Sequence, residues 1–178
     1  MSAHVPNDDE KKRNVKVLRI FNCLAVIFAF GVVTSASHAQ DLSNLPEPLA
    51  SKIEAAQQAC ADFDNGEFAL EWGAVSRVDL DGDLDRDWVL DESAFACSTA
   101  VSLYCGTGGC QSHFLVEDTV ATLLNQGWDV VTFGRLRVLL LDVHGSACDG
   151  INPTACVAAH VWDAEAKVWR SVQSQPEQ

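Results

Sequence analysis

The chain has 178 residues with 12 basic and 25 acidic side chains, which gives a net charge of −13. Residues 1–39 hold five of the basic and three of the acidic residues, so residues 40–178 alone carry a net charge of −15. Such an acidic surface repels phosphate backbones and anionic lipids, which argues against nucleic-acid binding.

Residues 1–39 have the three-part layout of a secretory signal peptide. A basic stretch, 11–19, precedes an apolar run, 20–33, and small residues including Ser37 and Ala39 stand before Gln40. A retained membrane anchor is the alternative, but such an anchor needs about 20 apolar residues and this run has 14. We therefore predict cleavage near Ala39-Gln40 and a single exported domain, 40–178, that is periplasmic or secreted and has no membrane association in the mature form.

The first element expected in the exported part is a helix over residues 49–63. Two prolines precede it, and Ser51 with Glu54 three residues later is typical of a capping box. Four apolar residues at helical spacing would form its buried stripe: Leu49, Ile53, Ala56 and Cys60.

The pattern changes to short β-rich runs after the turn signal Asn65-Gly66. The expected strands are 68–72, 74–80, 88–91, 114–116, 120–124, 128–133, 136–143, 157–162 and 168–172, the last two forming a hairpin. The sequence therefore predicts an α+β fold, in which an N-terminal helix packs on a mostly antiparallel β-sheet stabilised by disulfides.

The strongest local motif is DLDGDLDRD, residues 79–87, which lies between two apolar strands. Carboxylates occupy every second position: Asp79, Asp81, Asp83, Asp85 and Asp87. Each close pair of carboxylates costs about 1 kcal/mol even in water, and a hard divalent cation that takes six to eight oxygens would relieve the repulsion. We interpret the motif as a calcium loop of structural role, with a solvated acidic turn as the alternative.

The motif does not fit an EF-hand, which has Gly at position 6 and Glu at position 12, because Leu84 and Leu90 stand there. It resembles the D-x-D-G-D-x-x-x-D calcium loop of FG-GAP and VCBS-type repeats. That resemblance implies calcium ligands from the side chains of Asp79, Asp81, Asp83 and Asp87 and from the backbone carbonyl of Asp85. The family usually has Gly where Leu84 stands, and the single copy here does not imply a propeller fold.

Six cysteines follow residue 40, and six allow 15 connectivities. Proximity in the sequence favours Cys105–Cys110 and Cys148–Cys156, which leaves Cys60–Cys97 to tie the helix to the sheet. An oxidising destination makes disulfides the expected state. The alternative is a zinc site, since reduced Cys105 and Cys110 with His113 would form a C-x4-C-x2-H pattern.

The Gly-rich segment CGTGGC, residues 105–110, follows the aspartate motif. The combination resembles uncharacterised exported bacterial proteins that pair a D-x-D-G-D-type loop with a downstream C-G-[ST]-G-G-C segment. The resemblance implies an exported bacterial domain and brings no activity with it.

Two further patterns bear on function. Asp142, His144 and Ser146 suggest a hydrolase, but no G-x-S-x-G motif surrounds any serine, and a satisfied histidine at a strand end is the simpler interpretation. Five tryptophans could bind glycans or simply pack in the fold: Trp72, Trp88, Trp128, Trp162 and Trp169.

Taken together, these features predict an exported non-enzymatic calcium-binding domain stabilised by disulfides. Its partner would be an envelope protein, a secreted enzyme that it inhibits, or a glycan of the cell envelope. The alternatives are a small periplasmic hydrolase, a glycan-binding module, or a structural or calcium-sequestering envelope protein. We expect the acidic surface to prefer basic partners, with binding that weakens as salt rises.

Overall fold

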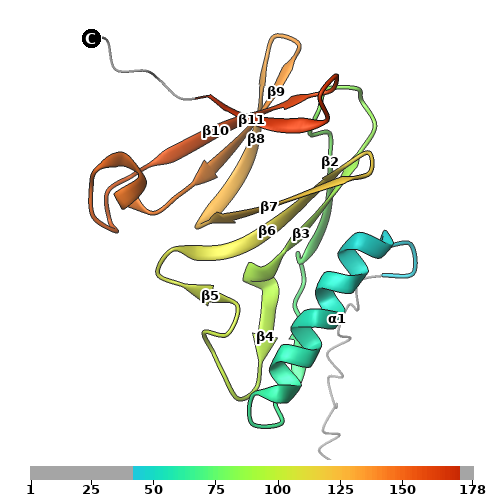
Figure 1. The fold of residues 1–178 in the computed structure, drawn as a ribbon, viewed down its shortest axis with the longest axis vertical. Helices are drawn as coiled ribbons and strands as arrows, with labels where there is room; N and C mark the ends of the chain where they lie inside the picture. Colours follow the sequence, from blue (N-terminus) through green and yellow to red (C-terminus); the bar gives the residue numbers. More distant parts are fainter. Residues whose placement is uncertain (1–41, 173–178) are drawn as a thin grey trace, which may run out of the picture. The chain divides into compact units, whose positions relative to one another are not determined.

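The computed structural model describes residues 42–172, which all belong to the unit Ser37–Gln178 (Figure 1). The predicted signal peptide lies outside the described residues. The elements are, in chain order, α1 (Glu47–Asp62), β1 (Phe68–Leu70), β2 (Val75–Val78), β3 (Asp87–Asp91), η1 (Glu92–Ala94), β4 (Phe95–Cys97), β5 (Cys105–Gly106), β6 (Gly109–Val116), β7 (Thr119–Asn125), β8 (Gly127–Phe133), β9 (Leu136–Asp142), η2 (Gly145–Cys148), β10 (Val157–Asp163) and β11 (Val168–Val172). One helix packed on antiparallel sheets confirms the α+β prediction.

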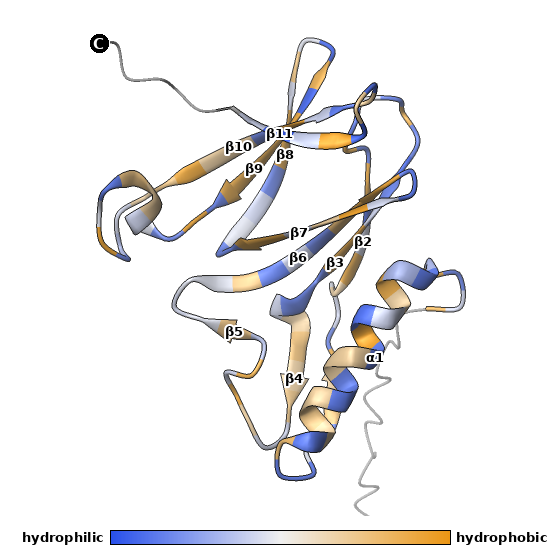
Figure 2. Ribbon diagram, in the orientation of Figure 1, coloured by the Kyte–Doolittle hydropathy of each residue, from blue (hydrophilic) through white to orange (hydrophobic). Residues whose placement is uncertain are grey.

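Helix α1 begins two residues earlier than expected, at Glu47 after Pro46. The predicted cap is wrong, because the Ser51 hydroxyl donates to the carbonyls of Glu47 and Pro48 inside the helix. Backbone N–H groups in the first turn of a helix have no carbonyl partner within the helix. Pro48, which lacks an N–H, is therefore tolerated there. The predicted stripe is confirmed, since its four members are the buried residues of the helix, and Figure 2 shows hydrophobic and hydrophilic residues alternating along α1.

The strands β2, β3, β5, β6 and β7 form one antiparallel sheet with β6 at its centre. Strand β6 pairs with β7 over nearly its whole length, and with β3 through residues 112–115. Strand β5 pairs with the first two residues of β6. A separate two-stranded sheet joins β1 to β4.

The strands β8, β9, β10 and β11 form a second antiparallel sheet in which neighbours in sequence are neighbours in space. The predicted terminal hairpin is confirmed, with Trp162 facing Trp169 in the register of β10 and β11. Strands β8 and β9 pair from Gly127↔Asp142 to Phe133↔Leu136, so their turn lies at Gly134-Arg135.

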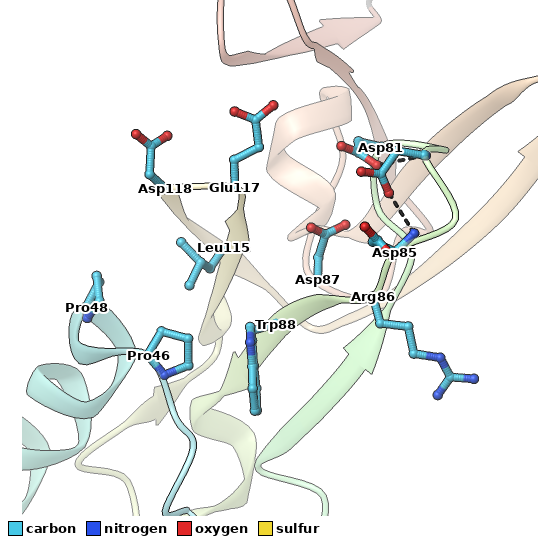
Figure 3. Close-up of a pocket in the computed structure, with 11 residues that line it drawn as sticks. Pro46, Pro48, Asp81, Asp85, Arg86, Asp87, Trp88, Leu115, Glu117 and Asp118 are labelled. Carbon is cyan, nitrogen blue, oxygen red and sulfur yellow. Dashed lines mark hydrogen bonds between the residues drawn. The ribbon is translucent and has the colours of Figure 1, made fainter.

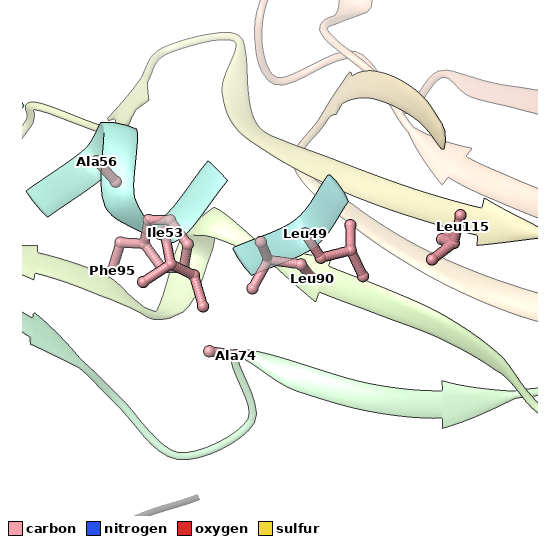
Figure 4. Packing of buried hydrophobic residues seen from close by; sticks show 7 residues of the cluster. All are labelled: Leu49, Ile53, Ala56, Ala74, Leu90, Phe95 and Leu115. Carbon is pink, nitrogen blue, oxygen red and sulfur yellow. The ribbon is translucent and has the colours of Figure 1, made fainter. Parts of the chain in front are cut away.

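Two apolar clusters lie on opposite faces of the central sheet, because successive side chains of a strand point to opposite faces. Leu90 of β3 and Leu115 of β6 join the buried residues of α1 in the first cluster (Figure 4). Their neighbours Val89 and Phe114 pack with Leu139 and other residues of the second sheet. The central sheet is therefore covered by α1 on one face and by the second sheet on the other.

Three disulfides join the pairs that sequence proximity favoured. Cys60–Cys97 links α1 to β4, Cys105–Cys110 joins facing residues of β5 and β6, and Cys148–Cys156 ties η2 to the segment before β10. These bonds fit a protein of an oxidising compartment. Within residues 42–172, no helix is both long and apolar enough to cross a membrane.

Several strand bounds differ from the prediction. Strands β4 and β5 were not expected, and β6 begins at Gly109 instead of residue 114. The sequence from Gly109 to His113 is polar and lacks the alternation of a half-buried strand. Tertiary context decides here, because this segment lies between β7 on one side and β3 and β5 on the other.

Candidate metal centre

The aspartate loop connects β2 to β3, whose pairing ends at Val78↔Asp87. Successive apolar residues of β2 and β3 pack alternately into the two buried clusters. This packing fixes the ends of the two strands, and residues 79–86 form the turn between them. Leu80 is fully buried in the second cluster and anchors the loop to the core. The loop is therefore short, acidic and fixed at both ends.

Three of the five predicted ligand residues converge. Asp79, Asp81 and Asp87 each offer a carboxylate oxygen, and these oxygens lie within 4.8 Å of one another. All three residues are half-buried, whereas Asp83 and Asp85 are exposed and do not belong to this group. The group could hold a metal ion, and carboxylate oxygens are donors that suit a hard cation.

Hydrogen bonds from backbone to side chain set the shape of the loop, and Figure 3 draws those among Asp81, Asp83 and Asp85 as dashed lines. The bonds run from Gly82 N to Asp79 Oδ1 (2.7 Å), from Asp83 N to Asp81 Oδ1 (3.0 Å), from Asp85 N to Asp83 Oδ1 (2.8 Å) and from Leu80 N to Asp87 Oδ2 (2.8 Å). Asp residues make such local bonds readily, so the alternating pattern folds the backbone around its own carboxylates.

Two loop residues have positive φ angles. Gly82 has φ +92°, which suits glycine. Leu84 has φ +78° and stands at position 6, where the resembling repeats usually have glycine. Its side chain is 80% exposed, so the strained conformation presents an apolar group to solvent instead of the core.

Arg137 of β9 donates from Nη2 to Asp79 Oδ2 at 2.8 Å, an ion pair between two half-buried side chains. The carbonyl of the neighbouring turn residue Arg135 also lies against Gly82, 3.1 Å from where a Cβ there would stand. Sequence reasoning missed this cation, because it lies 58 residues from Asp79 and only the packing of the two sheets brings it there.

Burial and neighbouring negative charges raise the pKa of two carboxyl groups in the loop. Burial raises the pKa of Asp87 to about 6, against a lowering by the hydrogen bond from Leu80, and the negative charges of Asp81, Asp83 and Asp79 raise it further. Burial also raises the pKa of Asp81, as does its neighbour Asp83. In both cases the anionic form is disfavoured, and a bound cation would stabilise that form.

The other candidate residues lie outside the aspartate loop. His144 Nδ1 lies 2.8 Å from Ser146 Oγ and accepts from the Ser146 backbone N–H, so this histidine caps η2. The zinc alternative is wrong, because Cys105 and Cys110 are bonded to each other. His113 instead lies 2.9 Å from Glu92 and 2.7 Å from the Thr122 hydroxyl.

Four of the five tryptophans pack in or against the two apolar clusters. Trp128, Trp162 and Trp169 belong to the second apolar cluster, and the Trp128 indole N–H donates to Asp91 at 2.8 Å. Trp88 packs against the first cluster with the Arg77 guanidinium 4.1 Å from its ring centroid. Trp72 is 83% exposed.

Comparisons with protein-family models, with curated proteins and with solved structures give no match for this chain.

Proposed function

We propose that the protein is an exported, non-enzymatic domain that binds one calcium ion in the loop between β2 and β3. The observation that carries the proposal is the convergence of Asp79, Asp81 and Asp87 on a loop anchored at both ends. Burial and, to a smaller extent, the neighbouring carboxylates disfavour the anionic form of Asp87 and raise its pKa to about 6, although Arg137 pairs with Asp79. A bound cation would stabilise the anionic form.

The resemblance to FG-GAP and VCBS-type calcium loops supports calcium over another cation. It adds the Asp83 side chain and the Asp85 carbonyl to the converging group. Calcium accepts more oxygen ligands and a more irregular arrangement than magnesium does, which suits a loop with carboxylates of differing burial. We infer a structural role, with a dissociation constant of about 10⁻⁴–10⁻³ M as in other extracellular modules.

Export is supported by the three disulfides and by the signal-peptide pattern of residues 1–39. Calcium at millimolar concentration is available outside the cytoplasm, which would let a site of this affinity fill. We therefore propose a periplasmic or secreted protein of bacterial type, whose partner is a protein or glycan of the envelope.

A thermal melt of the exported, oxidised protein in EDTA and in calcium tests the metal site. At tenfold excess over the dissociation constant, calcium should stabilise the fold by about 1.4 kcal/mol, a rise of about 5 °C for a domain of this size. Magnesium at the same concentration should give a smaller rise. The variant Asp81→Asn keeps an oxygen for the Asp83 N–H but loses the charge, so the calcium-dependent rise should be lost.

Asp129→Asn is the matched control. Asp129 is exposed on β8 and also accepts a local backbone N–H, from Val130, but it lies outside the converging group. This variant should keep the full calcium response. An equal melting temperature in EDTA and in calcium, for a protein that is folded in both, would reject the metal site.

A further inference from the structure

A hollow of about 550 Å³ lies beside the aspartate loop, where the start of α1 approaches β3 and the turn between β6 and β7 (Figure 3). Part of its lining is apolar: Trp88, Leu115, Pro46 and Pro48. A volume of this size is in the range of ligand sites, and an apolar floor distinguishes it from an acidic turn in open solvent.

The rim of this cleft is acidic on two sides. The loop contributes Asp81, Asp83, Asp85 and Asp87, and the turn between β6 and β7 contributes Glu117 and Asp118.

Three of these six carboxylates are not proposed as calcium ligands, so a bound calcium ion would leave them anionic: Asp85, Glu117 and Asp118. Of the lining residues only Arg86 is cationic, and Figure 3 shows its side chain directed away from the other lining side chains.

Two of the chain's own cations, which are not lining residues themselves, contact side chains that line the cleft. The Lys167 ammonium lies 2.7 Å from Glu117 and 3.5 Å from Asp118. The Arg77 guanidinium lies 4.1 Å from the ring centroid of Trp88. An ammonium on the rim and a guanidinium on the tryptophan are the two contacts that a basic side chain from outside would make.

We propose that this cleft receives a lysine- or arginine-bearing segment of a partner polypeptide. Apolar parts of the segment pack on Trp88 and Leu115, and its cationic groups pair with the rim carboxylates. The surface of net charge −15 attracts such a segment over a longer range. The inference deepens the proposed binding role and names the partner's chemistry, but it does not depend on calcium occupying the loop.

Fluorescence anisotropy with the labelled peptide Lys-Lys-Phe-Phe-Lys-Lys tests the proposal on the exported protein. The double variant Glu117→Gln/Asp118→Asn changes two exposed turn residues outside the metal group and should weaken binding at least about tenfold. It should keep the calcium-dependent rise in melting temperature. The control Glu54→Gln/Glu71→Gln removes the same charge from exposed positions outside the cleft and should change binding less than about twofold.

A variant with the opposite effect strengthens the test. Lys167→Asn removes the internal competitor for Glu117 and Asp118, and asparagine tolerates the positive φ of +54° at this position. Its affinity for the peptide should rise several-fold. In 300 mM salt, binding by all forms should weaken, because exposed charges are screened.

The proposal is overturned if no peptide binding is measured, or if the Glu117/Asp118 variant binds like its control. It is also overturned if Lys-Lys-Ser-Ser-Lys-Lys or spermine binds as tightly, since the apolar floor would then contribute nothing. A failed calcium response with peptide discrimination intact would reject the metal site and leave the cleft standing. The reverse result would reject the cleft alone.

Discussion

At the scale of single residues, the carboxyl group of Asp87 has two conflicting surroundings. It accepts the Leu80 backbone N–H at 2.8 Å, which favours the anion. Burial and the neighbouring carboxylates favour the neutral acid more strongly, so its pKa rises from an ordinary 3.8 to about 6. Between these two values the folded chain binds more protons at Asp87 than the unfolded chain does. The stability that this group contributes is therefore full below pH 3.8 and is lost as pH rises through 6.

This shift predicts the pH dependence of a variant pair. Asp87→Asn cannot ionise, and its amide oxygen can still accept from Leu80. In EDTA, the melting temperature of the native chain should therefore fall relative to that of Asp87→Asn as pH is raised from 5 to 7.5. Calorimetry at the two pH values measures this difference directly. In calcium at pH 7.5 the order should reverse, because only the native side chain offers an anionic ligand.

The pH dependence due to other titrating groups cancels in the difference between the two melting temperatures, because both chains contain those groups. His160, for example, has a pKa lowered by burial in both chains. A difference in melting temperature that stays constant from pH 5 to 7.5 would contradict the crowding argument. Asp129→Asn, compared in the same way, should show no such pH dependence, because it removes a charge outside the converging group.

At the scale of elements, apolar contacts hold α1 to the central sheet, and one disulfide joins it to β4 of the two-stranded sheet. Leu49, Ile53 and Ala56 pack on Leu90 and its neighbours. The Cys60–Cys97 disulfide joins the end of the helix to β4 across 37 residues of chain. A single helix on one face of a sheet has few neighbours of its own. We therefore expect Cys60–Cys97 to contribute more to the free energy of unfolding than either of the other two disulfides.

Removal of a disulfide should lower the free energy of unfolding more when the bond closes a longer loop. Cys60→Ala/Cys97→Ala should cost about 4 kcal/mol of unfolding free energy in the chain-entropy model, against about 2.5 kcal/mol for Cys148→Ala/Cys156→Ala. Urea denaturation of the native chain and of the two variants, all oxidised, measures both values. Equal costs would show that local packing at η2, and not chain entropy, sets the contribution of the shorter loop.

At the scale of the whole molecule, the disulfides are consistent with an oxidising compartment, and the acidic charge bears on the proposed binding of cations. Three disulfides form between all six cysteines of residues 42–172. Acidic residues outnumber basic ones 25 to 12 in the full chain, an excess that divalent cations outside the cytoplasm can offset. The proposed exported form should therefore be more stable where its disulfides persist than where they are reduced.

Export predicts a defined product. Expression of the full chain in an exporting bacterial host should yield a protein that begins at Gln40 and has no thiol reactive to iodoacetamide under denaturing, non-reducing conditions. Intact-mass spectrometry measures the N-terminus and the labelling together. Ala39→Arg, which replaces the small residue next to the cleavage position, should retain the N-terminal segment. A native chain that keeps residues 1–39 would contradict the signal-peptide prediction.

Some elements were predictable because their local pattern agrees with their final surroundings. The stripe of α1 and the β10–β11 hairpin follow from apolar spacing and a turn. The start of β6 was not predictable, because Gly109, Gln111 and Ser112 have no strand pattern and are held by pairing to three other strands. The helix start was misplaced because its prolines serve the first turn in place of a side-chain cap.

The candidate metal centre divides in the same way. The alternation of aspartates in residues 79–87 determined by itself that carboxylates would crowd on one loop, because local hydrogen bonds from backbone to Asp side chains need no distant partner. Only the tertiary structure decided that Asp79, Asp81 and Asp87 converge while Asp83 and Asp85 stay exposed. Leu80, which stands between Asp79 and Asp81, is fully buried in the second apolar cluster.

The sequence alone thus determined the acidic charge, the cysteine pairs close in sequence, the helical stripe and the aspartate motif, all of which depend on near neighbours or on composition. Only the tertiary structure decided the placement of Arg137 against Asp79, the Glu92–His113 contact and the cleft between the aspartate loop and Glu117. Each of these joins residues from separate strands or turns, and their distance in space depends on how the sheets and the helix pack.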